Sequence, residues 1–363
     1  MPGAAEQDTQ AIRVLVVSMW PSQRSPEFGI FVQRQVEALE RAGVEVHVAA
    51  LTDARSGRLR TPRKYLGLLM RTLVAVRRFR PDLIHAHFVV PTGSIARAAA
   101  AMTGTRLVVT AHGTDIRNAL AFPRVRRRTV DVLEQSRCVV AVSQQLADAI
   151  ASIAPDSAPR VIDMGIDTQV FAPPPQPAVL RAADEPFRMV CVASLLPNKN
   201  HANLIRAVAR IPQTRLVCVG EGPTRPALEA LIAELGVGDR VALTGRLPQE
   251  DVAEFYRTMD AACLVSLEEG FGLSALEAAA CGCPVIVSAS APVAAIIAQH
   301  DAGVMVDDPS SADAIAQAII ELGQYPRLAD DVSRAIVAGR STDDRAQEVT
   351  RLYADCVQVR REP

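Results

Sequence analysis

The sequence predicts an α/β protein made of two domains, each built on a doubly wound parallel sheet. Short β-branched runs alternate with helical stretches along the chain, which is the pattern of parallel βαβ units. The proline-rich segment 172–178 interrupts this alternation, because proline lacks an amide and restricts the residue before it. The alternation then resumes, and a length of 363 residues suits two domains better than one core.

The elements follow from the position of the apolar residues. In the first half we expect buried strands at 12–17, 44–51, 82–87, 107–111 and 139–142. In the second half we expect strands at 188–193, 215–220, 241–244, 261–265 and 284–288. Near the end, Val349, Leu352, Tyr353 and Cys356 repeat at i, i+3, i+4 and i+7, which predicts an amphipathic helix.

These elements give the predicted domain boundaries. Residues 1–171 form a Rossmann-like N-terminal domain with a tail at 1–10, and 172–186 form a linker. Residues 187–340 form the second domain, and 341–363 form a helix that can cross back to the first. Ligands of doubly wound sheets bind at the carboxyl ends of the strands, so we expect a site there.

The composition narrows the cellular setting. No apolar run approaches the roughly 18 residues that span a bilayer, and the first ten residues lack the apolar block of a secretory signal. Seven cysteines sit mostly in apolar segments, as reduced buried thiols of a cytosolic protein do. Cys281 and Cys283 form the only close pair, too little for a zinc site. We therefore expect a cytoplasmic protein without a bound metal.

The segment 266–285 carries the strongest chemical signal. Glu269 lies in a loop, and Glu277 lies one turn inside a helix that begins near Leu273. Gly270 and Gly272 allow the backbone to approach a ligand closely. The free amides at the helix start suit an anion such as a diphosphate, and the two carboxylates suit sugar hydroxyls. A capped helix with incidental glutamates is the alternative for this loop taken alone.

The same segment resembles the Glu-x7-Glu signature of the retaining glycosyltransferases of the GT-B fold, family four. The resemblance includes both glutamates, the Gly-Phe-Gly-Leu loop and the following Cys-Gly-x-Pro-Val. It implies that Glu269 contacts hydroxyls of the donor sugar and that Glu277 holds the ribose. It also implies that the backbone amides of Phe271, Gly272 and Leu273 face the donor.

The resemblance extends over nearly the whole chain. It implies donor-side positions at Gly29, Ser194, Gly222, Arg246 and Leu247, and acceptor-side positions at His87 and Asp115. In this interpretation His112, Lys199 and Glu269 are the catalytic residues. Taken alone, His112 is equally an ordinary histidine at a strand end, and Lys199 a solvated loop lysine.

The histidines His85 and His87 precede this region in a strand-like run. We expect their side chains to point to opposite sides, so that at most one faces the ligand. There are also departures from the family pattern: Ala193-Ser194 stands where many members have Gly-Arg, and Ala294-Ala295 where they have Pro-Glu. These departures leave open a catalytically weak nucleotide-sugar-binding relative.

The chain contains no Asp-x-Asp triplet, with which metal-dependent transferases hold a divalent cation. We therefore expect a nucleotide-diphosphate sugar as co-substrate and no metal. In this interpretation Lys199 and the backbone amides at the helix start stabilise the negative charge of the leaving diphosphate. The resemblance implies a same-face displacement in which the donor phosphate takes the acceptor proton. A sugar-nucleotide epimerase or a phosphorylase-like protein is the alternative enzyme, and a sugar-nucleotide sensor the non-catalytic one. A nicotinamide oxidoreductase is disfavoured, because no Gly-x-Gly-x-x-Gly follows the first strand.

The charge is unevenly distributed although its sum is -1. Residues 1–180 hold 22 Lys and Arg against 15 Asp and Glu, and the remainder holds 17 against 25. The basic residues cluster at Arg58–Arg80, together with leucines, and at Arg124–Arg128. These clusters suit an anionic leaflet, so a lipid-linked or saccharide acceptor and a peripheral position on the inner membrane face are expected. A solvated helix and a small soluble acceptor are the alternatives; nucleic acid is not expected, because stacking aromatics are missing.

Overall fold

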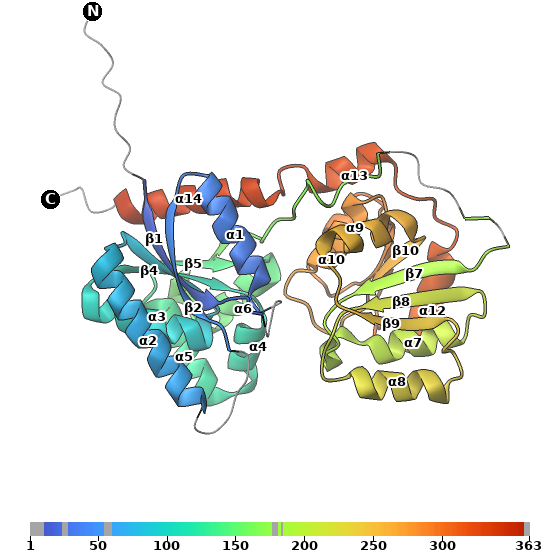
Figure 1. The fold of residues 1–363 in the computed structure, drawn as a ribbon, viewed down its shortest axis with the longest axis horizontal. Helices are drawn as coiled ribbons and strands as arrows, with labels where there is room; N and C mark the ends of the chain where they lie inside the picture. Colours follow the sequence, from blue (N-terminus) through green and yellow to red (C-terminus); the bar gives the residue numbers. More distant parts are fainter. Residues whose placement is uncertain (1–10, 24–27, 54–59, 176–180, 183, 359–363) are drawn as a thin grey trace, which may run out of the picture. The chain divides into compact units, whose positions relative to one another are not determined.

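The structure is a computed structural model that describes residues 11–23, 28–53, 60–175, 181–182 and 184–358 (Figure 1). It divides into two compact units, the first made of residues 1–164 and 342–363, the second of residues 165–341. The C-terminal segment thus belongs to the unit that the N-terminal half builds. The predicted tail 1–10, Arg58 and linker residues 176–180 and 183 lie outside the described residues.

Unit 1 is built on six parallel strands in the order β2-β1-β3-β4-β5-β6. They are β1 Arg13–Met19, β2 Glu45–Leu51, β3 Leu83–His87, β4 Arg106–Ala111, β5 Cys138–Ala141 and β6 Arg160–Val161. The helices are α1 Ile30–Arg41, α2 Arg60–Phe79, α3 Ser94–Thr103, α4 Thr114–Ala121, α5 Pro123–Glu134, α6 Gln144–Ile153 and α14 Thr342–Gln358, with short turns η1 Val89–Gly93 and η2 Pro155–Ser157. The sheet order reverses between β1 and β3, which makes this the point where ligands of doubly wound sheets bind.

Helix α14 completes the core of unit 1, although it is the last element of the chain. Its apolar stripe of Val349, Leu352, Tyr353 and Cys356 is buried against β1 and α1. Arg41 of α1 pairs with Asp343 of α14 at 2.6 Å. The amphipathic pattern predicted for this helix is confirmed, because the four predicted positions are all buried.

Unit 2 is built on six parallel strands in the order β12-β11-β10-β7-β8-β9. They are β7 Phe187–Val192, β8 Thr214–Val219, β9 Val241–Gly245, β10 Ala261–Leu264, β11 Val285–Ser288 and β12 Gly303–Val306. The helices are α7 His201–Ala209, α8 Arg225–Glu234, α9 Gln249–Thr258, α10 Leu273–Ala280, α11 Ala294–Gln299, α12 Ala312–Leu322 and α13 Asp330–Val337, with the turn η3 Pro197–Lys199. In chain order this is 3-2-1-4-5-6, and the order reverses between β7 and β10.

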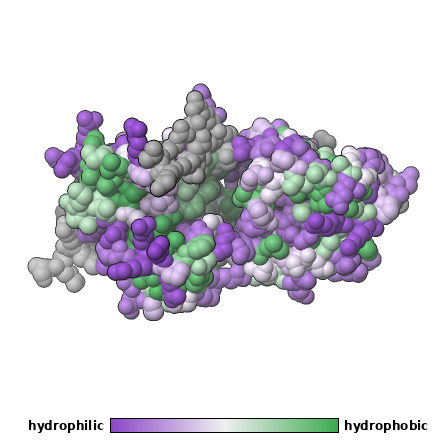
Figure 2. Space-filling model, turned by 90° about the horizontal axis from the view of Figure 1, so that it is seen from below, coloured by the Kyte–Doolittle hydropathy of each residue, from purple (hydrophilic) through white to green (hydrophobic). Residues whose placement is uncertain are grey.

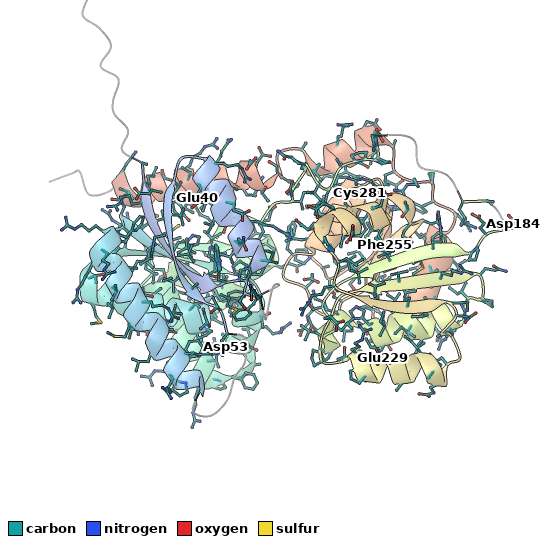
Figure 3. The ribbon with its side chains drawn as sticks, viewed as in Figure 1. Glu40, Asp53, Asp184, Glu229, Phe255 and Cys281 are labelled. Carbon is teal, nitrogen blue, oxygen red and sulfur yellow. The ribbon has the colours of Figure 1, made fainter. Side chains whose placement is uncertain are left out.

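Two apolar clusters cover the two faces of the unit 2 sheet. One packs α7, α8 and α12 against the strands, and the other packs α9, α10, α11 and α13 (Figure 1). Five of the seven cysteines belong to these two clusters, and Cys138 and Cys356 belong to the core of unit 1. All seven are free thiols, and only Cys138 is half-buried. Cys281, which ends α10 (Figure 3), has no exposed surface.

The predicted fold class is confirmed, since both units are doubly wound parallel sheets. Each predicted strand is present within one or two residues of its predicted bounds. The two short strands β6 and β12 were not predicted. Within the described part of the chain, no helix has the length and apolar character needed to cross a membrane.

Candidate active site

The switch point of the unit 2 sheet holds a lysine and a glutamate from two different strands. Lys199 follows β7 and Glu269 follows β10, the strands between which the sheet order reverses. Nζ of Lys199 lies 2.6 Å from Oε2 of Glu269, and Oγ of Ser266 lies 3.2 Å from the same oxygen. The side chains of Lys199 and Glu269 are 20% and 13% exposed, so the pair is largely shielded yet open to a ligand.

The loop after β7 is fastened to the loop after β10. Asn200 adopts a φ of 61° and donates from Nδ2 to the carbonyl of Val265 at 3.0 Å. The N–H of Leu267 donates to the carbonyl of Asn198 at 2.8 Å. Asparagine tolerates the left-handed conformation better than most residues do, which suits it to this turn. These bonds hold Lys199 within reach of Glu269.

The start of α10 provides backbone donors beside this pair. Gly272 caps the helix at a φ of 109°, and no side chain caps the first turn. A Cβ on Gly272 would lie 2.5 Å from Cγ1 of Val293, so the position accepts only glycine. The first amides of a helix have no partner within it, which makes them donors to an anion. Phe271, Leu273 and Glu277 are half-buried around this turn.

The loops after β8 and β9 extend the same edge of the sheet. Gly222 packs so closely on the loop after β7 that a Cβ there would lie 2.3 Å from the carbonyl oxygen of Leu195. Ser194, on that loop, is exposed. After β9, Arg246 is exposed and Leu247 is half-buried against the apolar cluster of α9 and α10. The predicted donor-side residues of unit 2 therefore share one edge.

The switch point of the unit 1 sheet holds Gly29 and a group of aromatic rings. Gly29 precedes α1 at a φ of 83°, and a Cβ there would lie 2.2 Å from the carbonyl oxygen of Met19. Phe31 follows it, and its ring centroid lies 5.0 Å from that of His112 and 5.9 Å from that of Phe88. The first turn of α1 and the loop after β3 thus meet around His112, which follows β4.

The histidines of β3 join this group, and the expected orientation of their side chains was wrong. The rings of His85 and His87 lie on the same side of the strand with their centroids 4.4 Å apart. Residues i and i+2 of a strand share a face, because successive side chains alternate. Both side chains are fully buried. Nδ1 of His87 lies 3.2 Å from Nε2 of His112.

Asp115 holds the loop that carries His112. Oδ1 accepts the backbone N–H groups of His112 at 3.2 Å and of Gly113 at 3.0 Å, and Oδ2 accepts that of Val89 at 2.9 Å. The side chain is buried, and burial raises the pKa of Asp115 while these N–H donors oppose the rise. Its carboxylate therefore ties the loop after β4 to the turn after β3.

Burial keeps the three histidines neutral. It lowers the pKa of His85 and of His112 to about 3, and with the neighbouring imidazoles it lowers the pKa of His87 well below its ordinary value. His112 therefore offers one N–H donor and one lone pair near neutral pH, and no positive charge. Among the described residues, no group of three or more His, Cys, Asp or Glu side chains is arranged to hold a metal ion.

The sequence did not single out Ser266, Phe31, Phe88 or Tyr353 as site residues. Phe31 and Phe88 each lie close to a predicted residue in the chain, Gly29 and His87, and this nearness was the available signal. Tyr353 lies 268 residues from the histidine that it contacts, so nothing local indicates it.

Comparison with known proteins finds a glycosyltransferase family model for each half of the chain. Two family models match the chain: the one described as Glycosyltransferase Family 4 at residues 29–170, and the one described as Glycosyl transferases group 1 at residues 174–337. The GDP-mannose-dependent alpha-(1-6)-phosphatidylinositol monomannoside mannosyltransferase of Mycolicibacterium smegmatis is 31% identical over 265 residues, which are 68% of this chain and 67% of that protein. The D-inositol 3-phosphate glycosyltransferase of Acidothermus cellulolyticus is 29% identical, covering 94% of this chain and 80% of that protein.

Solved structures share the fold. Sucrose-phosphate synthase from Thermosynechococcus elongatus superposes with a TM-score of 0.80 at 22% identity, covering 95% of this chain and 99% of that one. Anabaena HepE in complex with UDP-glucose gives 0.77 at 18% identity, covering 95% and 100%. Together with the two family models, the fold and the polar switch points define a nucleotide-sugar glycosyltransferase of the GT-B type. The chain belongs to glycosyltransferase family 4.

Proposed function

We propose that this glycosyltransferase is retaining and metal-independent, and transfers a sugar from a nucleotide diphosphate to an acceptor hydroxyl. The observation that carries the proposal is the ion pair of Lys199 and Glu269 beside the uncapped start of α10. An ammonium and unpaired backbone amides supply positive charge where a diphosphate departs. In this proposal they do so without a bridging cation.

The remaining residues take roles around this pair. Lys199 and the amides of Phe271 to Leu273 face the diphosphate, Glu269 accepts hydrogen bonds from sugar hydroxyls, and Glu277 holds the ribose. Gly29, Ser194, Gly222, Arg246 and Leu247 complete the donor side. We assign Asp115 to the orientation of His112, since its carboxylate already accepts the backbone N–H groups of His112 and Gly113.

The reaction is a displacement on one face of the sugar. The bond from the anomeric carbon to the phosphate oxygen breaks, and a bond from that carbon to the acceptor oxygen forms on the same face. The acceptor proton passes to the departing phosphate oxygen, so no side chain is needed as the general base. Because the acceptor attacks on the face that the phosphate leaves, no nucleophilic carboxylate is needed on the opposite face. Its contribution is positioning and charge stabilisation of an oxocarbenium-like transition state.

Substitution of the pair tests the proposal. A thermal-shift screen with UDP-, GDP- and ADP-sugars identifies the donor, and turnover is then measured with EDTA present. Lys199→Ala and Glu269→Gln should each lower kcat by about 10²–10³, the range typical of a lost transition-state contact. The control Arg206→Ala, on the exposed side of α7, should leave kcat unchanged.

Three results would contradict the proposal. They are kcat values of both variants within a few-fold of wild type, loss of turnover on adding EDTA, and a product whose anomeric configuration by NMR is inverted from that of the donor. Donor binding without turnover would identify the catalytically weak relative instead.

We further propose that the acceptor is a lipid-linked or saccharide intermediate reached at an anionic membrane surface. On α2, Leu66, Met70 and Val74 are 61%, 54% and 42% exposed, and their spacing of four residues places them in one stripe. Arg63, Arg77 and Arg78 are exposed around this stripe and have no ion-pair partner among the described residues. The relatives named for phosphatidylinositol and inositol phosphate support an anionic acceptor. A small soluble phosphorylated acceptor is the alternative.

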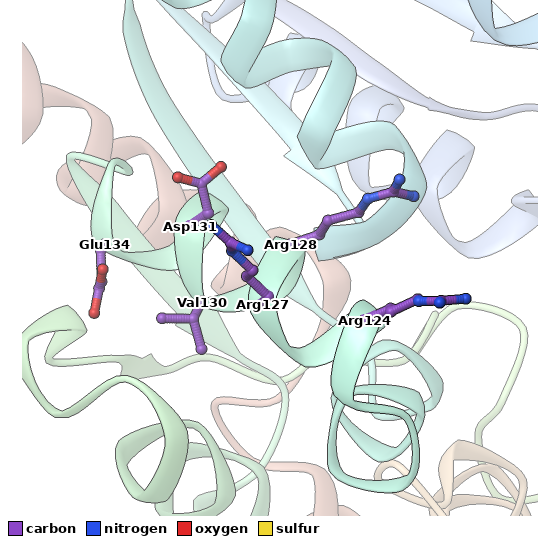
Figure 4. Close-up of a pocket in the computed structure, with 6 residues that line it drawn as sticks. All are labelled: Arg124, Arg127, Arg128, Val130, Asp131 and Glu134. Carbon is purple, nitrogen blue, oxygen red and sulfur yellow. The ribbon is translucent and has the colours of Figure 1, made fainter.

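A second basic surface lies on α5. Arg124 and Arg128 lie one helical turn apart, and with Arg127 they line a surface hollow of about 620 Å³ that Val130, Asp131 and Glu134 complete (Figure 4). Apolar and strongly polar side chains alternate on the face of unit 1 seen in Figure 2. Such a mixture suits lipid headgroups above acyl chains, to which each cation near the surface contributes roughly 1 kcal/mol.

A further inference from the structure

The buried residues His85, His87 and Tyr353 form a continuous array with the half-buried His112 inside unit 1. Nδ1 of His85 lies 2.6 Å from the hydroxyl of Tyr353 on α14, and its Nε2 lies 2.8 Å from Oγ1 of Thr110. The ring of His85 packs on that of His87. His87 in turn lies 3.2 Å, from Nδ1 to Nε2, from His112. The array therefore runs from the last helix of the chain to the loop after β4.

The hydrogen bond between His87 and His112 contains one proton, and the surroundings decide which ring donates it. Nε2 of His87 is buried and has no hydrogen-bond partner among the residues that the structure describes. A buried N–H without a partner is rarer and costlier than a buried acceptor without one. Nε2 of His87 is therefore the unprotonated nitrogen of a neutral ring, and Nδ1 carries the proton.

This arrangement fixes the tautomer of His112. Nε2 of His112 accepts the hydrogen bond that Nδ1–H of His87 donates, so Nε2 of His112 carries no proton. In the neutral ring of His112 the single N–H is therefore at Nδ1. Nδ1 of His112 makes no hydrogen bond to a described residue and is not among the buried unpartnered atoms, so it is the ring nitrogen open to a ligand. Phe88 and Phe31, with ring centroids 4.6 Å and 5.0 Å from that of His112, limit rotation of the ring.

We infer that His87 is a positioning residue that holds His112 as the Nδ1–H tautomer, so that His112 donates a hydrogen bond to a sugar hydroxyl. The inference deepens the proposed function and rests on it for the identity of the ligand. The ring of His85 packs against that of His87, and the hydroxyl of Tyr353 holds His85 in place by a hydrogen bond. The titratable groups that face His112 are His87 and His85 from β3, with Asp115 on its own loop and Tyr353 beyond His85.

The tautomer of His112 can be measured directly. Long-range ¹⁵N–¹H NMR of the ¹⁵N-histidine-labelled full-length protein separates the two tautomers, and the chain has only six histidines. A His112→Gln variant assigns the signal. Wild-type protein should show His112 with its proton on Nδ1, whereas an Nε2–H tautomer or a charged ring would overturn the inference. This readout needs no donor or acceptor, so it holds even if the proposed reaction is wrong.

Variants of His87 connect the tautomer to turnover. His87→Phe keeps a ring and removes the donor, so the Nδ1–H signal of His112 should be lost and kcat should fall about 10-fold, as for one hydrogen bond. His87→Gln restores an N–H donor and should recover most of both. Tyr353→Phe, which removes only a hydroxyl from His85, should leave the His112 tautomer unchanged. A His87→Phe variant that folds and keeps the wild-type tautomer would contradict the inference, as would a His87→Gln variant no better than His87→Phe.

Discussion

Gly222 shows how a single missing side chain sets the position of the loops after β7 and β8. A Cβ at this position would lie 2.3 Å from the carbonyl oxygen of Leu195, which belongs to the backbone and cannot yield as a flexible side chain does. Gly222→Ala should therefore separate the two loops and lower the free energy of unfolding by about 1–3 kcal/mol, the usual cost of overpacking. Donor affinity should fall with it.

Urea unfolding and a donor thermal-shift assay check this prediction. Gly238→Ala is a matched control, because its Cβ would meet only Cγ2 of Ile232 at 3.8 Å, an ordinary contact. It should be neutral or slightly stabilising. Equal stability of the two variants would show that the loops adjust freely.

The sequence predicted which residues form the candidate site better than it predicted the contacts that these residues make. The resemblance placed Lys199 and Glu269 in one site, and the structure joins them at 2.6 Å. The two histidines of β3 were predicted on opposite faces because the alternation of side chains was applied to i and i+2 instead of i and i+1. The contact of Tyr353 with His85 depends on tertiary packing alone, so no local pattern predicts it.

Among the elements, α2 has an outer face that differs from that of an ordinary surface helix. Leu66, Met70 and Val74 are exposed in one stripe while Leu68 and Thr72 are buried on the opposite side. If this face meets an anionic bilayer, replacing Arg63, Arg77 and Arg78 by glutamine should lower binding about 100-fold, from roughly 1 kcal/mol per cation. Replacing the three apolar residues by serine should also lower binding, at low and high salt alike.

Flotation with vesicles of phosphatidylcholine, with and without phosphatidylglycerol, measures this binding. Ile320→Ser is the control, since Ile320 is 51% exposed on α12 of unit 2. It should float like wild type. Wild-type protein that stays with the soluble fraction at low salt would remove the membrane proposal and favour a small acceptor.

Elements were predictable where a run of apolar residues was long enough to show its period. Strands of five to seven residues such as β1, β3 and β8 fall close to their predicted bounds. β6 has only two residues, too few to show a period of two. β12 has four residues, as many as the predicted strands β5, β10 and β11, so its length does not explain why it was missed. β12 also begins at Gly303, where a Cβ would lie 1.9 Å from the carbonyl oxygen of Val285, so its place depends on close strand packing.

At the scale of the molecule, the chain leaves unit 1 after residue 164 and returns to it at residue 342. Two interactions hold the C-terminal helix α14 on unit 1. Arg160 forms an ion pair with Asp355 at 3.0 Å, and the hydroxyl of Tyr353 is hydrogen-bonded to His85. The core of unit 1 is therefore built from the N-terminal half of the chain and from α14. A helix pattern at 349–356 could be predicted from the sequence, whereas its partner surface could not, because that surface exists only after the sheet has formed.

The buried histidines make the stability of unit 1 dependent on pH. Burial lowers the pKa of His85 and of His112 to about 3, whereas an unfolded chain titrates its histidines near 6.5. Well above a pH of about 6.5 neither state takes up these protons, so the histidines cause no slope. As the pH falls below that value, these histidines become protonated in the unfolded state but stay neutral in the folded state. The free energy of unfolding should then fall by about 1.4 kcal/mol per pH unit for each such histidine.

Fluorescence of the single tryptophan, Trp20, reports on unit 1, because it packs against the cluster of β1, α1 and α14. Urea unfolding followed by this signal at pH 7.5, 6.5, 5.5 and 4.5 should show a small loss of free energy between the first two values and a steeper, steady loss below pH 6.5. His85→Gln should reduce the slope of free energy against pH by the contribution of one histidine. A free energy that stays constant down to pH 4.5 would mean that the array takes up protons while folded, and that the unpartnered nitrogen of His87 has a partner in solution.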